Sequence, residues 1–262
     1  MFFGMPTLIE LNTVEDCAAL CKELGLHFVE LNMNLPQYQL NRIDVPYFKE
    51  IAEKYSIFYT IHLDENLDVS DFNPYIADGY RRTVMETVAL AKELEIPVLN
   101  MHLSKGVYFT LPEQKVYLFD QYRSLYLNSI AAFKDLCQTV IDSSKIKICV
   151  ENCDGFRGFQ KEALDILLES PVFGLTYDIG HDHGCGGVDA SCILARQDKL
   201  CHMHMHDAVG KKNHMALGTG EMDIGKSLTL AAEQNCRVVL ETKTVEGLKK
   251  SAQWVRGKGY LL

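Results

Sequence analysis

The sequence has no C-x-x-C pair, no apolar run near the roughly 20 residues that cross a bilayer, and no basic segment at its N-terminus. The last two absences argue against a membrane anchor and a secretory signal. The nine cysteines are an odd number, which argues against a complete disulfide framework. We therefore expect reduced and mostly buried thiols in a cytoplasmic protein that does not bind a membrane.

No Gly/Ser-rich or Pro-rich linker divides the chain, and no block of five or more like charges forms a tail. The 262 residues match the size of one (β/α)8 barrel, which typically has about 250 residues. A hydrophobic content of 47% supplies enough apolar side chains for a sizeable core. We expect a single domain that covers residues 1–262.

Two further absences narrow the class of ligand. The formal net charge is -9, so the chain lacks the excess of basic residues on which a general affinity for nucleic acid rests. A G-x-G-x-x-G segment that opens a helix after a strand is also missing, and the glycine cluster at 184–187 does not supply one. We expect a small-molecule substrate, no nucleic acid partner and no nicotinamide cofactor.

Short β-branched or apolar runs alternate with longer amphipathic stretches along the whole chain, which is typical of repeated βα units and a parallel sheet. The predicted strands are 2–5, 28–32, 58–62, 98–102, 146–151, 173–178, 200–204 and 238–241. The predicted helices after the first are 45–55, 78–94, 115–143, 160–169, 188–196, 226–234 and 245–258. Eight such units predict an α/β fold, the (β/α)8 TIM barrel.

The first helix is predicted from its ends. Asn12 is the expected N-cap, with Glu15 three residues later, and Gly25 is the expected stop. The longest irregular stretches, 64–75, 104–112, 152–159, 180–187 and 207–225, each follow a strand. They are the loops in which barrel enzymes build their sites.

Ionisable or imidazole side chains end six of the predicted strands. They are His62, His102, Glu151, Asp178, His204 and Glu241. In a parallel barrel the C-terminal strand ends surround one pocket, so these side chains are expected to meet there. Three carboxylates that face one pocket repel each other, and a divalent metal ion relieves the repulsion.

The ligand types restrict the metal. Three oxygen donors with the imidazole of His204 suit Mn²⁺, Mg²⁺ or Co²⁺, and Zn²⁺ also accepts them. Adding His62 and His102 makes the site richer in nitrogen, which favours zinc and leaves room for a second ion bridged by Glu151. One ion or two are both open at this point.

For other polar residues near the strand ends the sequence gives weaker evidence of a role in the site. His206 alternates with His204, which favours a place behind the ligands, and Asp207 either orients a histidine or caps the following turn. Glu30 ends another strand and is a candidate contact for substrate hydroxyls. Lys105, just beyond a strand end, is a candidate for binding a substrate phosphate.

Several motifs, in order, resemble the xylose isomerase-like TIM-barrel superfamily, which includes sugar epimerases, sugar-phosphate isomerases and endonuclease IV. They are Val150-Glu151-Asn152, Asp178-x-x-His181, His204-x-x-Asp207, His214-Met-Ala-Leu217-Gly218-Thr-Gly220-Glu221 and Leu240-Glu241-Thr242. The resemblance implies that Glu151, Asp178, His204 and Glu241 hold one metal ion, that the two glutamates also move protons, and that His181 contacts substrate. It also implies a dimer or a tetramer.

The reaction that the resemblance implies is isomerisation or epimerisation of a small sugar or sugar phosphate. The metal ion would stabilise an enediolate while Glu151 and Glu241 remove and return a proton. A dehydratase on the same scaffold is one alternative. A zinc-dependent phosphodiesterase of the endonuclease IV type is another, because His62, His102, His181 and His214 also match that enzyme, although Lys212 stands where its third zinc needs an aspartate.

Overall fold

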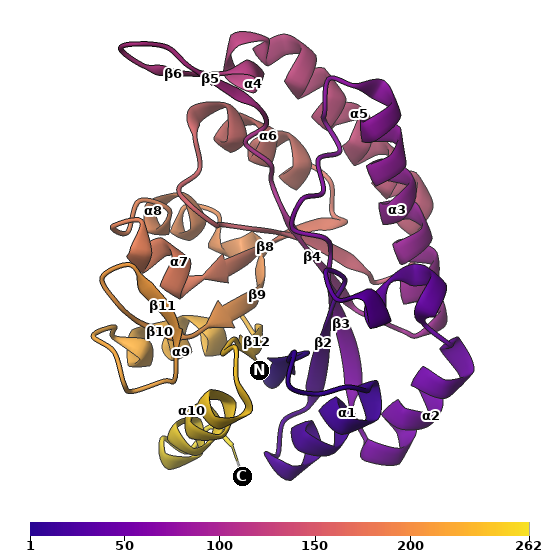
Figure 1. Ribbon diagram of the computed structural model, residues 1–262, viewed down its shortest axis with the longest axis vertical. Helices are drawn as coiled ribbons and strands as arrows, with labels where there is room; N and C mark the ends of the chain where they lie inside the picture. The colour runs from indigo at the N-terminus through magenta and orange to yellow at the C-terminus, as the bar shows by residue number, and fades with distance from the viewer. Residues whose placement is uncertain (262) are drawn as a thin grey trace.

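Eight parallel strands form a closed barrel in the computed structural model, which describes residues 1–261 (Figure 1). Around the barrel the order is β1-β2-β3-β4-β7-β8-β9-β12, and β12 pairs with β1. The strands are β1 (Phe2–Pro6), β2 (Phe28–Asn32), β3 (Phe58–His62), β4 (Val98–His102), β7 (Lys147–Glu151), β8 (Phe173–Asp178), β9 (Leu200–Met205) and β12 (Arg237–Leu240). The predicted (β/α)8 TIM barrel is confirmed, with each strand within two residues of its expected bounds.

Helices surround the strands, with α1, α2, α3 and α5 on one side of the view in Figure 1 and α7 to α10 on the other. The helices are α1 (Val14–Glu23), α2 (Val45–Tyr55), α3 (Pro74–Glu93), α4 (Leu118–Gln121), α5 (Arg123–Ile141), α6 (Gly158–Leu168), α7 (Ile179–Gly184), α8 (Ala190–Leu194), α9 (Ile224–Glu233) and α10 (Val245–Gly257). Short 3-10 turns occupy Pro36–Tyr38, Leu40–Arg42 and Gln197–Lys199. No helix in the described range is both long and apolar enough to cross a membrane.

Several local predictions were wrong. The cap of α1 is Thr13 with Asp16, one residue beyond the predicted pair, because Asp16 accepts from the Thr13 N–H while donating its own N–H to the Thr13 hydroxyl. The predicted helix 115–143 begins with a strand, β6 (Lys115–Tyr117), which pairs with β5 (Tyr108–Thr110) in a hairpin that projects from the barrel (Figure 1). The predicted loop 180–187 is largely helix α7, capped by Asp178.

The inside of the barrel has a buried polar layer beneath the strand ends. Side chains two residues apart point to the same face of a strand. The residue two positions before each strand-end group therefore also points into the barrel, one layer deeper. The members are Glu30, Thr60, Asn100, Thr176 and His202, each at most 2% exposed. This layer supports the groups above it through hydrogen bonds.

Candidate metal centre

Four side chains converge at the C-terminal end of the barrel. Glu151, Asp178, His204 and Glu241 each offer one ligand atom, and these atoms lie within 4.8 Å of one another. Nδ1 of His204 is 3.2 Å from Oε1 of Glu151, 3.3 Å from Oε2 of Glu241 and 3.9 Å from Oδ2 of Asp178. The structure thus brings together the four residues that the sequence analysis placed in one metal site.

Two atoms that face the centre of this set have no hydrogen bond. Nδ1 of His204 and Oε2 of Glu241 are buried, and no hydrogen bond reaches them from residues 1–261. Nε2 of His204 is also without a hydrogen bond in this range, but it faces Oε1 of Glu30 at an ion-pair distance of 2.8 Å. Buried polar atoms are normally paired, so orphaned ones indicate a missing partner. A divalent cation is the partner that suits both a nitrogen lone pair and a carboxylate oxygen. The donor set therefore fits a metal ion.

Electrostatics in the metal-free protein support the same interpretation. Burial raises the pKa of Glu151 and of Glu241, but His204 together with His102 for Glu151, and with Lys243 and His214 for Glu241, holds both pKa values well below their usual range. Burial lowers the pKa of His204, but Glu151 and the other carboxylates raise it well above its usual value. A protonated His204 therefore supplies the positive charge that a bound ion would bring.

Glu151 faces two groups of histidines. Its Oε1 points toward His204, whereas its Oε2 lies 3.4 Å from Nε2 of His62 and 3.3 Å from Nε2 of His102. Nδ1 of His62 is 2.7 Å from the Leu63 carbonyl and donates to it, which leaves Nε2 as the free ligand atom. Nε2 of His102 is buried without a hydrogen bond from the described residues. This is the arrangement of a carboxylate that could bridge two ions.

Asp178 is held by its neighbours. Its Oδ1 accepts the backbone N–H of His181 at 2.7 Å and so caps α7. The side-chain amide of Asn152 donates to the backbone carbonyl of Asp178 and accepts its N–H, both at 2.9 Å. The Val-Glu-Asn motif therefore fixes a candidate ligand on the next strand as well as supplying one.

Sequence analysis missed Asn100 and Thr176. The Asn100 amide donates to Oε2 of Glu151, and its carbonyl oxygen accepts the Thr176 hydroxyl at 2.5 Å. Their inward register, two residues below His102 and Asp178, is the signal that could have identified them. Polar residues at these two positions have a clear function, which is to hold Glu151 in place.

Glu30 lies behind the site. It is 2% exposed, and its Oε2 accepts the Thr60 hydroxyl and Nε2–H of His202, each at 2.8 Å. Its Oε1 is 2.8 Å from Nε2 of His204. Burial raises the pKa of Glu30, but His204 and His202 lower it below its usual range. Both oxygens therefore have protein partners, and Glu30 also lines the cavity beside Glu241. Its expected contact with substrate hydroxyls stays a prediction.

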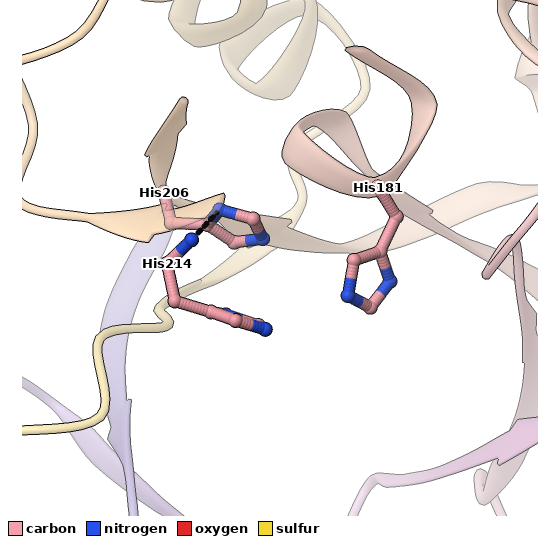
Figure 2. Close-up of side chains that lie close together, drawn as sticks. All are labelled: His181, His206 and His214. Carbon is pink, nitrogen blue, oxygen red and sulfur yellow. Dashed lines mark hydrogen bonds between the residues drawn. The ribbon is translucent and has the colours of Figure 1, made fainter. Parts of the chain in front are cut away.

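Three further histidines form a second group beside the four ligands (Figure 2). The rings of His181, His206 and His214 approach one another, with a separation of 4.3 Å between the ring centres of His206 and His214. Nδ1 of His214 is 3.3 Å from the Glu241 carbonyl oxygen. Burial lowers the pKa of His214 to about 4. His214 is therefore a neutral ring beside Glu241.

The two lysines near the site differ. Lys105 pairs with Asp154 and is half-exposed, so it lies at the rim and not among the ligands. Lys243 contacts the centre directly, because its Nζ is 2.8 Å from Oε1 of Glu241. A cavity of about 160 Å³ adjoins Glu241 and is also lined by His62, Asn32, Thr242 and Lys243.

The chain belongs to the xylose isomerase-like TIM barrel family, whose sequence profile matches residues 18–258. It is 21% identical to an uncharacterized protein of Methanocaldococcus jannaschii, over 77% of this chain and 73% of the relative. The crystal structure of a D-tagatose 3-epimerase-like protein is similar with a TM-score of 0.80 at 22% identity, covering 98% of this chain and 96% of that one. The structure of IOLI protein with a binding zinc atom has a TM-score of 0.75 at 16% identity, covering 99% and 98%.

Proposed function

We propose that the protein is a divalent-metal-dependent isomerase or epimerase of a small sugar or sugar phosphate. The observation that carries the proposal is the convergence of Glu151, Asp178, His204 and Glu241 at the barrel mouth with two buried ligand atoms unpaired. The sugar-epimerase name of one structural neighbour and the zinc ion named in another point in the same direction.

The proposed chemistry is proton transfer at a carbon next to a carbonyl. A divalent ion held by the four ligands would polarise that carbonyl and stabilise the charge that develops on its oxygen. Glu151 and Glu241 are on strands separated by β8 and β9, so they approach a bound substrate from different directions. One glutamate removes the proton and the other returns it, which inverts the carbon if they act on different faces.

Both glutamates have the charge state that this role requires. Their pKa values are held below the usual range, so each is ionised at neutral pH and can accept a proton. Glu241 is the more accessible one, because it lines the cavity and its Oε1 is held by Lys243 at 2.8 Å. Lys243 itself has a raised pKa, since Glu241 outweighs the effect of burial, and it keeps its charge at the cavity wall.

The experiment that tests the proposal follows proton exchange directly. Protein stripped with a chelator and reloaded with Mn²⁺ or Zn²⁺ is incubated in D2O with ketopentoses, ketohexoses and their phosphate esters. We expect metal-dependent deuterium incorporation beside the carbonyl of at least one sugar, detected by NMR, together with an epimer or isomer as product. The absence of exchange with every sugar would overturn the proposal, and elimination of water instead would identify a dehydratase.

A phosphodiesterase of the endonuclease IV type is the second candidate. It is favoured by the position of His62 and His102 on one oxygen of Glu151, which suits a second ion. The net charge of -9 and Lys212, an exposed cation in place of an acidic ligand, weigh against it. Incision of a duplex with an abasic site, tested with zinc-loaded protein, would decide for this candidate.

A further inference from the structure

Three histidines meet beside the proposed metal centre in a way that resembles a second metal site. His181, His206 and His214 each offer a ring nitrogen, and the three atoms lie within 4.8 Å of one another. Figure 2 shows the rings of His206 and His214 one above the other, and the His181 ring, which extends from its helix, beside them. Three imidazoles at this spacing suit zinc. The hydrogen bonds of His206 give the cluster a different function.

The proton on the His206 ring is placed by a backbone amide. The N–H of His214 lies 2.8 Å from Nδ1 of His206 (Figure 2). Nδ1 also lies 3.5 Å from the Asp207 carbonyl oxygen, but the contact with the amide is much the shorter of the two. An amide N–H can only donate, so Nδ1 accepts it and has no proton. The proton of the neutral ring is then on Nε2. A ring nitrogen that bears a proton cannot bind a metal ion, so His206 is not a ligand in this arrangement.

The Nε2–H of His206 is directed at a ligand of the four-residue site. It lies 3.1 Å from Oδ1 and 3.2 Å from Oδ2 of Asp178. Oδ1 also accepts the backbone N–H of His181, so the carboxylate is held from two sides. Because these contacts fix its rotation, Oδ2 stays directed toward the other ligands. His206 is 0% exposed, and water does not compete for the hydrogen bond.

The ring of His206 fits into a space that only glycine leaves open. A Cβ at position 180 would lie 1.9 Å from Cε1 and 2.3 Å from Nδ1 of His206. No real side chain tolerates contacts this short, so Gly180 is required for the ring to occupy its place. Gly180 follows Asp178 by two residues in the same helix start. The helix that Asp178 caps therefore also provides the slot for the ring that orients Asp178.

On its other side the His206 ring contacts His214, a residue with a strained backbone. His214 has a φ of 53°, in the left-handed region that residues with a side chain rarely adopt. Its N–H bond to His206 stabilises this conformation, which places its own ring 5.4 Å from that of His181. His206 therefore connects a metal ligand on β8 with the hairpin of β10 (Asp207–Val209) and β11 (Lys212–Met215).

We propose that His206 is a positioning residue that donates from Nε2 to Asp178, accepts the His214 backbone N–H at Nδ1, and thereby sets the affinity of the four-residue site for its metal ion. The inference rests on the proposed metal site and not on the sugar chemistry. Partners of this kind around a metal ligand typically change metal affinity by about 10–100-fold.

Metal binding to chelator-stripped protein tests the inference by calorimetric titration with MnCl2 and, separately, ZnCl2. His206→Phe removes both hydrogen bonds and should weaken binding about 10–100-fold without changing the number of ions bound. His206→Gln keeps an N–H near the position of Nε2 and should recover most of the affinity. His206→Asn keeps an acceptor near the position of Nδ1 but is too short to place an N–H near the position of Nε2, and it should bind as weakly as the Phe variant.

The control is His183→Gln, because His183 is on the same helix as His181 but pairs with Glu221 at 2.9 Å instead of Asp178. It should bind metal as the unmodified protein does. Loss of one whole ion in His206→Phe, with the remaining affinity unchanged, would show that the ring is a ligand and overturn the inference. Equal affinities in the Gln and Asn variants would also overturn it. A general packing defect would weaken both variants alike, whereas a hydrogen bond to Asp178 is kept only by the Gln variant. The titration needs no sugar turnover, so it remains decisive even if the proposed reaction is wrong.

Discussion

Oε1 of Glu30 lies 2.8 Å from Nε2 of His204, whose other ring nitrogen, Nδ1, faces the carboxylates of the metal centre. A carboxylate at this distance attracts the ring proton to Nε2 and leaves the lone pair on Nδ1 for a metal ion. Thr60 and His202 hold the other oxygen of Glu30. The candidate ligand His204 is thus oriented from the buried polar layer below it.

Removing the charge of Glu30 should weaken metal binding. We expect Glu30→Gln to lower the affinity for Mn²⁺ about 10–100-fold, because the amide no longer fixes the His204 proton on Nε2. Calorimetric titration of chelator-stripped protein measures this affinity. Glu113→Gln, at an exposed position, is the control and should bind normally. Normal binding by Glu30→Gln would show that Glu30 has no role in orienting the ligand.

Replacing Glu241 should reduce turnover far more than it reduces the stability of the fold. Glu241→Gln keeps the size of the side chain and removes the acid/base group, so we expect at least about a 100-fold loss of sugar exchange. The melting temperature of the metal-free variant should change little. Glu113→Gln, the same substitution at an exposed position, is the matched control. Exchange retained by Glu241→Gln at the rate of the control would remove Glu241 from the mechanism.

Metal-free protein should lose stability as the pH rises. Burial lowers the pKa of His62, but Glu151 outweighs it and raises the pKa from 6.5 to about 9. The resulting stabilisation is fully present below pH 6.5 and is lost as the pH rises through 9. From this shift we expect the free energy of unfolding to fall by about 3 kcal/mol over that range, measured by urea denaturation.

Metal should abolish much of this pH dependence, because a bound ion replaces the proton on the histidines of the site. His62→Gln should reduce the slope in metal-free protein, since it removes one of the titrating groups. An unchanged slope in that variant would assign the effect to other residues.

Asp207 should contribute strongly to stability. Its Oδ1 accepts the N–H groups of Ala208 and Met222, and its Oδ2 accepts those of Gly218 and Gly220, at 2.9 to 3.2 Å. The structure therefore supports the predicted role in capping the following turn.

Asp207→Ala leaves four donors unpaired and should cost about 3 kcal/mol or more. Asp223→Ala removes one cap bond, to Lys226 N, and should cost about 1 kcal/mol. Urea unfolding of both variants makes the comparison. Equal losses would mean that the four bonds of Asp207 are not cooperative in holding the loop.

A methyl group at Gly180 should disturb the metal centre. Gly180→Ala would bring a Cβ within 1.9 Å of the His206 ring, so the ring must move away from Asp178. We expect about a 10-fold loss of metal affinity. Gly184→Ala is the matched control in the same helix, because a Cβ at Gly184 has nothing within 4 Å. Equal affinities for the two variants would mean that the ring adapts without affecting Asp178.

The sequence determined the barrel through local periodicity. Runs of apolar residues that end in His62, His102, Glu151 or Asp178 predicted strands whose last residues are those same groups. Caps and hairpins were less predictable, because neighbouring residues compete for the same hydrogen bonds. Thr13 replaced Asn12 as the cap of α1 in this way.

What only the tertiary structure decided is which polar groups meet across the barrel. Glu30 and His202 are 172 positions apart along the chain, and their hydrogen bond depends on how the strands are placed around the closed sheet. The role of His206 depends likewise on the space beside Gly180 and on the backbone of His214. The sequence alone predicted the four candidate ligands because each lies at or next to the end of its own strand. Their orientation arises from buried partners on other strands, and that information appears only when the barrel closes.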